Sequence, residues 1–248
     1  MNNTIIYNIS HLSFTWSPPK AIKNGTAKYI ITDFSAQLYK RQIIALIGCN
    51  GSGKSTLLKI LSGLNRCYEG EIIFDGQRLT DIRPRSLAQK MSYMAQIGGA
   101  MPPFTVREIV DMGNYAKARS SDSSQNKADT ENAIRLTGIT FDPNKPFREL
   151  SGGQQQRVMV ARAVCQSSKV MLLDEPLSGL DIVAKESIMK MLRDITDTQD
   201  SLVLLSTHDI DLAVQYADRI LAFYGTTPQM MLPTELNDDK IKEIFNEH

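Results

Sequence analysis

The segment from Gly48 to Ser55 has the residue types and spacing of a phosphate-binding loop. It reads Gly-Cys-Asn-Gly-Ser-Gly-Lys-Ser, which fits the pattern G-x-x-x-x-G-K-[ST] at every fixed position. Glycines let a backbone turn tightly enough for its N–H groups to point at phosphate oxygens, and a following helix adds its dipole. We expect Lys54 to neutralise the β- and γ-phosphates of a nucleotide and Ser55 to ligate Mg²⁺. The predicted phosphate-binding residues are Gly48, Cys49, Asn50, Gly51, Ser52, Gly53, Lys54, Ser55 and Thr56.

Two alternatives to a triphosphate site remain for this loop. One is a glycine-rich turn that binds no ligand. The other is a dinucleotide-binding turn, but its pattern G-x-G-x-x-G is not met and it would give Lys54 no role.

A pair of acids follows a second apolar run. Residues 170–173 are Val-Met-Leu-Leu, and Asp174, Glu175 and Pro176 come directly after them. A buried strand that ends in acids places them at the carboxyl edge of a parallel sheet, where ligands of α/β proteins bind. Asp174 suits a direct or water-mediated contact with Mg²⁺, and Glu175 suits a general base that polarises the attacking water. Taken alone, such a strand end is more often a solvated loop; beside a phosphate-binding loop, the catalytic interpretation is favoured.

The pattern of apolar runs indicates how these residues are positioned. Runs at 43–47, 170–173, 202–205 and 220–223 predict buried parallel strands, and helices are expected at 55–64, 184–196 and 209–216. The alternation of Leu12, Phe14 and Trp16, with β-prone runs at 29–31 and 71–74, predicts an antiparallel β part with a hairpin turn at Asn24-Gly25. The middle of the chain predicts helices at 106–116, 127–137 and 154–165.

These elements predict an α/β fold: a P-loop NTPase core with a mainly parallel sheet flanked by helices, an antiparallel β subdomain and an inserted helical subdomain. We expect residues 1–95 and 169–248 to form the nucleotide-binding core and residues 96–168 the helical subdomain, within one domain of 248 residues.

A third motif, Leu-Ser-Gly-Gly-Gln-Gln-Gln-Arg at 150–157, opens the last of the middle helices. Ser151 can cap a helix whose first turn holds Gly152 and Gly153, which leaves N–H groups free for an anion. A plain N-cap is the alternative, but two glycines weaken a helix by about 1 kcal/mol each without a structural gain.

Together with the phosphate-binding loop, Asp174-Glu175 and Ser178-Gly179-Leu180-Asp181, this motif resembles the ATP-binding subunits of ABC transporters over essentially the whole chain. The resemblance implies an ATPase that uses ATP and Mg²⁺ and converts ATP and water to ADP and phosphate. It also implies a homodimer that sandwiches two ATP molecules. Each ATP would then contact the signature of the opposite chain, which here comprises Ser151, Gly152, Gly153 and Gln154.

Four further positions follow the pattern of that family. Gln96 matches the glutamine that senses Mg²⁺ and water and links the core to the helical insertion, and His208 matches the switch histidine beside the γ-phosphate. Asp181 matches the D-loop, which crosses the dimer interface. Trp16 matches the aromatic residue that stacks on adenine, although it could instead join Leu12 and Phe14 in the core.

The segment Val106–Tyr115 resembles the importer branch that serves iron-siderophores, haem and cobalamin. Transmembrane permease subunits are then the direct partners, and a substrate-binding protein is an indirect one. The alternatives are an exporter subunit, an ABC ATPase that works without a permease, and a regulatory nucleotide-binding protein that does not hydrolyse ATP. Intact Glu175 and His208 speak against the last.

Composition limits the other classes. An apolar fraction of 42% and a charged fraction of 22% are typical of globular proteins and not of disordered ones. With 28 Lys and Arg against 27 Asp and Glu, no basic excess favours a nucleic-acid partner. No apolar run approaches the about 20 residues that a membrane-spanning helix needs. Three cysteines without metal-ligand spacing suit reduced thiols in a cytoplasm. The resemblance to ABC transporter subunits implies a peripheral subunit on the cytoplasmic face of the cell or inner membrane.

Overall fold

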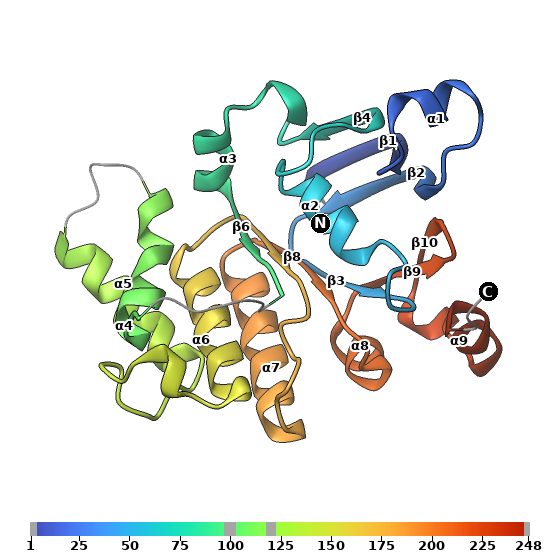
Figure 1. Cartoon of the computed structure of the whole chain (residues 1–248). Helices are drawn as coiled ribbons and strands as arrows, with labels where there is room; N and C mark the ends of the chain where they lie inside the picture. Colours follow the sequence, from blue (N-terminus) through green and yellow to red (C-terminus); the bar gives the residue numbers. More distant parts are fainter. Residues whose placement is uncertain (1–3, 97–102, 118–122, 246–248) are drawn as a thin grey trace.

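The computed structural model describes residues 4–96, 103–117 and 123–245 and contains two β-sheets with helices around them (Figure 1). The central sheet has six strands in the order β10-β9-β3-β8-β7-β6, and only the β10–β9 pair is antiparallel. Its strands are β3 (Gln42–Ile47), β6 (Met91–Met94), β7 (Val170–Leu173), β8 (Leu202–Ser206), β9 (Arg219–Tyr224) and β10 (Thr227–Met231). The predicted α/β fold class is confirmed.

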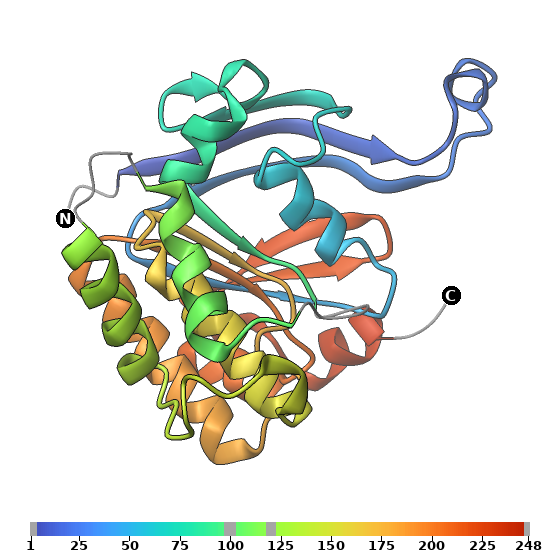
Figure 2. The same cartoon turned by 60° about the vertical axis from the view of Figure 1, so that its left-hand side comes forward.

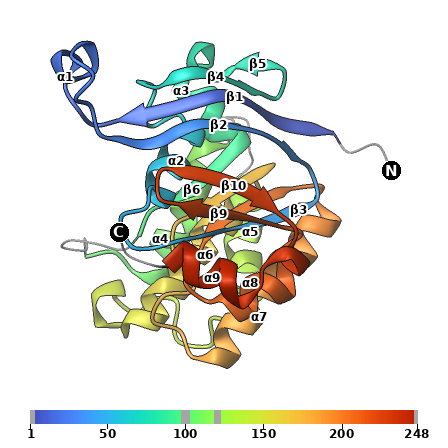
Figure 3. The ribbon, with the colours of Figure 1, turned by 90° about the vertical axis from the view of Figure 1, so that its right-hand side faces the viewer.

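Alternation along β3 shows how the two faces of this sheet are covered. Ile43, Ala45 and Ile47 point into one hydrophobic cluster, and Ile44 and Leu46 point into another. Helices cover the first face, and α2 with the second sheet covers the other, as the turned views show (Figures 2 and 3). Because both faces are buried, the strands read as continuous apolar runs in the sequence.

The second sheet is antiparallel, with the order β2-β1-β4-β5. Its strands are β1 (Ile5–Thr15), β2 (Tyr29–Tyr39), β4 (Glu69–Phe74) and β5 (Gln77–Arg78). Asn24 and Gly25 lie in a turn, but the expectation of a hairpin turn there is wrong, because a short helix, α1 (Pro19–Lys23), lies between β1 and β2 and Asn24 ends it. Proline is a favoured residue at the first position of a helix.

Helices occupy the middle of the chain, between β6 and β7. They are α4 (Val106–Asp111), η2 (Met112–Ala116), α5 (Ser123–Leu136), η3 (Phe147–Glu149) and α6 (Gly152–Cys165). The remaining helices are α2 (Lys54–Leu61), η1 (Leu79–Asp81), α3 (Pro84–Lys90), α7 (Ile182–Thr198), α8 (Ile210–Tyr216), η4 (Pro233–Glu235) and α9 (Asp238–Phe245). Within the described residues, no helix has both the length and the apolar character needed to cross a membrane.

Candidate functional site

A cavity of about 540 Å³ lies at the carboxyl edge of the central sheet. It is lined by the phosphate-binding loop together with side chains from three later segments of the chain. The lining residues are Asn50, Gly51, Gly53, Lys54, Ser55, Thr56, Gln96, Glu175 and His208. The fold thus brings together residues that the sequence analysis selected from four separate motifs.

The phosphate-binding loop joins β3 to α2, and its backbone conformation at Gly53 excludes a side chain. Gly53 has φ +109°, and a Cβ atom there would lie 2.8 Å from Ile30 Cγ2, so only glycine fits. Helix α2 begins at Lys54, one residue earlier than expected, and no side chain caps its first turn. The N–H groups of that turn are therefore available to an anion, supported by the positive end of the helix dipole.

Lys54 is a buried cation, with only 5% of its surface exposed. Its Nζ donates hydrogen bonds to the carbonyl oxygens of Gly48 and Cys49, at 2.7 and 2.8 Å. Burial lowers the pKa of Lys54 below its ordinary value, and the nearby negative charge of Glu175 opposes that shift. A triphosphate would supply the anionic partner that two neutral carbonyls do not.

Asp174 connects the phosphate-binding loop to the acidic strand end. This carboxylate is 3% exposed, and its Oδ1 accepts hydrogen bonds from Ser55 Oγ at 3.0 Å and from Ser206 Oγ at 2.7 Å. The predicted proximity of Ser55 and Asp174 is thus present in the structure.

Glu175 lies where three elements converge. Its Oε2 accepts a hydrogen bond from Gln96 Nε2 at 3.0 Å, and its Oε1 lies 3.3 Å from His208 Nε2. Its backbone has φ +50°, in the left-handed region that residues with a side chain rarely adopt. Strained backbone of this kind clusters at functional sites, where the surrounding structure holds it in place.

The signature segment lies outside this cavity. Ser151 caps α6 by accepting from Gln154 N, while Gln154 Oε1 accepts from Ser151 N at 3.0 Å, so the predicted cap is present in its reciprocal form. Ser151 and Gly152 are exposed. A Cβ atom on Gly153 would lie 2.8 Å from the carbonyl oxygen of Gly179, so this glycine allows close contact between α6 and the loop after Glu175.

Two other predicted residues also lie outside the cavity. Trp16 follows the end of β1 and is 64% exposed, with its ring edge-on to Phe14 at a centroid distance of 4.8 Å. It is therefore not part of the core, whereas Leu12 and Phe14 are. Asp181 is exposed and caps α7, where its Oδ1 accepts from Ala184 N at 2.8 Å.

Sequence reasoning missed two residues that contact Glu175. Ser206 Oγ accepts from Glu175 N at 2.8 Å, and Gln156 Nε2 donates to Glu175 O at 2.5 Å. Each residue is polar at a position that its element buries: the end of apolar β8 and the inner face of α6. That mismatch was the available signal. We call Lys54, Ser55, Asp174, Glu175 and Ser206 the edge cluster.

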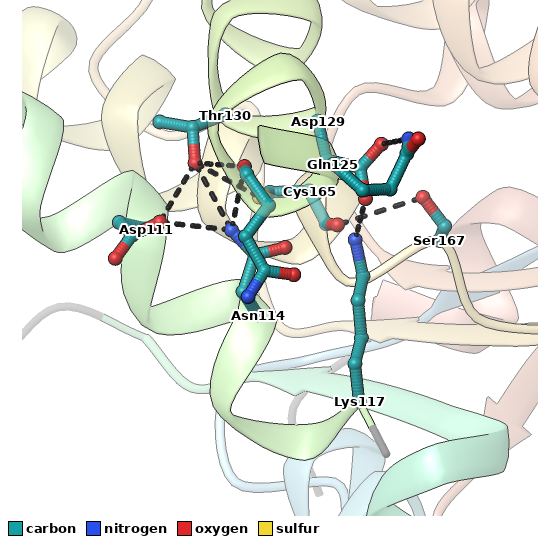
Figure 4. A network of polar contacts seen from close by, with 9 residues as sticks. Asp111, Asn114, Lys117, Gln125, Asp129, Thr130, Cys165 and Ser167 are labelled. Carbon is teal, nitrogen blue, oxygen red and sulfur yellow. Dashed lines mark hydrogen bonds and ion pairs between the residues drawn. The ribbon is translucent and has the colours of Figure 1, made fainter. Parts of the chain in front are cut away.

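A second polar cluster lies between α4, α5 and η2 (Figure 4). Asn114 Nδ2 donates to Asp111 Oδ1 at 2.9 Å and to Thr130 Oγ1 at 3.0 Å, and Thr130 Oγ1 donates to Asp111 Oδ1 at 2.9 Å. Lys117 pairs with Asp129 beside them. We call these five residues the helix cluster.

Comparison with known proteins places the chain in a family. The family model described as ABC transporter matches residues 31–178. The chain is 33% identical over 221 residues to the achromobactin transport ATP-binding protein of Dickeya dadantii, which covers 88% of this chain and 82% of that one. It is 30% identical over 220 residues to the petrobactin import ATP-binding protein of Bacillus anthracis, covering 87% and 81%.

A solved structure supports the fold. The dimeric ATP-binding cassette MJ0796 with ADP and phosphate bound has a TM-score of 0.81 to this chain at 24% identity, covering 92% of this chain and 99% of that one. At that identity the likeness concerns the fold alone. The resemblance inferred from the sequence motifs is confirmed: this chain belongs to the ABC transporter family and is an ATP-binding ATPase.

Proposed function

We propose that this chain is the ATP-hydrolysing subunit of an ABC importer for a substrate of the iron-siderophore, haem or cobalamin type. The observation that supports hydrolysis best is the single cavity that Lys54, Glu175 and His208 line together. The substrate class follows the names of the relatives, which include achromobactin, petrobactin and hemin transport proteins. Substrate choice itself would belong to membrane and binding proteins outside this chain.

The oxygen donors of the site fit Mg²⁺, which prefers hard oxygen ligands and keeps several waters. Ser55 Oγ and Asp174 Oδ1 already lie 3.0 Å apart, and Gln96 lines the same cavity. Ser55, Gln96 and Asp174 would hold the ion, directly or through water, together with phosphate oxygens. When bound, the ion neutralises charge that develops on the phosphates.

The protein residues then have separate tasks in the proposed mechanism. Trp16 stacks on adenine, while Lys54 and the loop N–H groups bind the phosphates. The Glu175 carboxylate accepts a proton from the water that attacks the γ-phosphorus, and ADP leaves with the bridging oxygen. His208 Nε2, 3.3 Å from Glu175 Oε1, is placed to orient that carboxylate and contact the γ-phosphate.

The proposed assembly is a homodimer with two shared ATP sites. The signature segment would contact ATP bound to the opposite chain. Its residues Ser151, Gly152, Gly153 and Gln154 do not line the cavity of their own chain, and Ser151 and Gly152 are exposed. Asp181 would lie at the dimer interface. The dimer would bind permease subunits at the cytoplasmic face of the membrane as a peripheral component, and the permease would receive substrate from a binding protein. The division into a core (1–95 and 169–248) and a helical subdomain (96–168) belongs to the same proposal.

Glu175→Gln tests the catalytic assignment. We expect kcat for ATP hydrolysis to fall by about a hundredfold or more, because the amide cannot accept the proton, while ATP still binds and still promotes dimer formation. Glu186→Gln is the matched control, since Glu186 is a partly exposed residue of α7 and pairs only loosely with Lys190 at 3.8 Å. Wild-type turnover in Glu175→Gln, measured by phosphate release, would remove the proposed role.

The importer assignment has a separate test. We expect the chain to co-purify with a permease expressed with it, and ATP-dependent uptake of an iron-siderophore or haem into proteoliposomes that contain both. Outward movement of substrate in that assay would favour the exporter instead.

A further inference from the structure

The backbone of Glu175 is held from both sides of its Cα atom. Its N–H donates to Ser206 Oγ at 2.8 Å, and its carbonyl oxygen accepts from Gln156 Nε2 at 2.5 Å. These two bonds fix the peptide groups on either side of a residue with φ +50°. A left-handed residue that is not glycine needs such support, because the conformation is unfavourable on its own.

Both supporting side chains are buried and directional. Ser206 is fully buried, and Gln156 is 4% exposed. The Ser206 hydroxyl donates its hydrogen to Asp174 Oδ1 at 2.7 Å, so its lone pair is left to accept from Glu175 N. One hydroxyl therefore fixes the Asp174 carboxylate and the Glu175 backbone together.

We propose that Ser206 and Gln156 are positioning residues for hydrolysis: they hold Glu175 in its left-handed conformation and thereby aim its carboxylate at the attacking water. The proposal rests on the base role proposed above for Glu175. Neither residue needs to touch ATP. Each acts through Glu175, because the direction of the Cα–Cβ bond is set by the two peptide groups that they bind.

Gln156 adds a mechanical link to this arrangement. It lies on α6 about one turn after Gly152 and Gly153, and Gly153 itself packs against the carbonyl of Gly179. These two contacts would couple a movement of the first turn of α6 to the segment from Glu175 to Gly179. In the proposed dimer, that first turn contacts the opposite ATP, so each chain would tie the occupancy of one site to the geometry of the other.

The test uses Ser206→Ala and Gln156→Met, which remove each hydrogen bond with little change in volume. We expect kcat to fall by about tenfold to a hundredfold at unchanged KM for ATP, because misaimed groups slow the chemistry and not the binding. Ser206→Thr, which retains the hydroxyl, should recover most of the rate.

Two matched controls separate positioning from stability. Ser168→Ala removes a buried hydroxyl that donates to Val170 O at 2.8 Å, at the opposite edge of the same sheet. Gln166→Met removes an amide that donates to Met91 O at 2.7 Å, beyond the other end of α6. Both controls should lower the unfolding temperature about as much as the test variants do, with kcat unchanged.

A double variant decides whether the positioning acts through Glu175. In a Glu175→Gln background, adding Gln156→Met should leave the remaining single-turnover rate unchanged, because the positioned base is already absent. Gln156→Met is the variant for this step, since Ser206 also bonds Asp174. A further loss of tenfold there would overturn the proposal. A wild-type kcat in Ser206→Ala would also overturn the proposal. If that variant does not fold, a wild-type kcat in Gln156→Met would do so. Normal turnover in Glu175→Gln alone would instead show that the proposed base role is wrong.

Discussion

The edge cluster and the helix cluster are both polar and largely buried, yet they differ in what their groups still lack. In the helix cluster the charged groups pair with other side chains, as Asp111 does with Asn114 and Thr130, although the neutral Asn114 Oδ1 has no hydrogen-bond partner among the described residues (Figure 4). In the edge cluster, the cation of Lys54 rests on two neutral carbonyls, and Glu175 has a strained backbone beside an open cavity. Buried polarity alone therefore does not indicate a functional site.

A cysteine beside the helix cluster illustrates the same difference. Cys165 is buried, and its thiol lies 3.8 Å from Thr130 Oγ1. Burial raises the pKa of this thiol, which keeps it protonated and unreactive. The helix cluster is thus suited to fixing α4 and α5 relative to each other. In the edge cluster, the buried Lys54 cation bonds two neutral carbonyl oxygens and would be stabilised further by an anion.

The largest expected effect concerns Lys54→Ala. ATP binding should weaken by about 2–5 kcal/mol, because a buried charge that meets the phosphates is lost, while the free energy of unfolding should barely change. Isothermal titration with ATP and urea unfolding measure the two quantities. Lys59→Ala, on the exposed face of α2, is the control and should alter neither. Full ATP affinity in Lys54→Ala would contradict the view that Lys54 in the edge cluster binds the phosphates.

Thr130→Val tests the helix cluster in the opposite sense. It removes the hydroxyl that donates to the Asp111 carboxylate and accepts from Asn114 Nδ2, which should cost about 1–3 kcal/mol of unfolding free energy, while kcat per folded molecule stays unchanged. Urea unfolding and phosphate release give the two numbers. Thr198→Val removes an exposed hydroxyl that bonds a helix carbonyl and should cost less. A large drop in kcat for Thr130→Val would mean that the helix cluster also serves the chemistry.

Gly153→Ala examines the contact between α6 and the loop after Glu175. The new Cβ atom would lie 2.8 Å from Gly179 O, and relieving that overlap should cost about 1–3 kcal/mol of stability. Gly152→Ala is the matched control, because its Cβ atom meets nothing within 4 Å and alanine favours a helix. Thermal unfolding distinguishes the two. Equal unfolding temperatures for both variants would show that α6 is not packed tightly against that loop.

The sequence predicted the fold and the edge cluster unevenly. The runs at 43–47, 170–173 and 202–205 became β3, β7 and β8 because a strand buried on both faces needs apolar residues at every position. By contrast, β6 and β10 were not predicted, because their sequences are not continuously apolar: β6 contains Ser92 and Tyr93, and β10, at the sheet edge, contains Pro228. The residues 97–102, within the helical subdomain expected at 96–168, lie outside the described structure.

The candidate site shows where sequence reasoning ends. Lys54, Ser55, Asp174 and Glu175 belong to motifs whose spacing fixes their geometry, and they lie together as expected. Ser206 and Gln156 have no such motif in common, and only the packing of α6 and β8 against the turn at Glu175 brings them to one backbone. The exposure of Trp16 could not be predicted either, since its alternation with Leu12 and Phe14 continues past the end of β1 at Thr15.

The smallest expected effect is a pH dependence that only the edge cluster should show. Burial lowers the pKa of folded Lys54 below the ordinary value near 10.5, so between these two values the unfolded chain binds more protons. The free energy of unfolding of the unmodified chain should therefore rise with pH between these two pKa values. Lys54→Ala lacks this titrating group and should not show the rise. Urea unfolding of both proteins at stepped pH measures the difference. Bound triphosphate should remove the rise, because its charge restores the pKa of Lys54; a rise of the same size with ATP bound would mean that the phosphates do not meet this lysine.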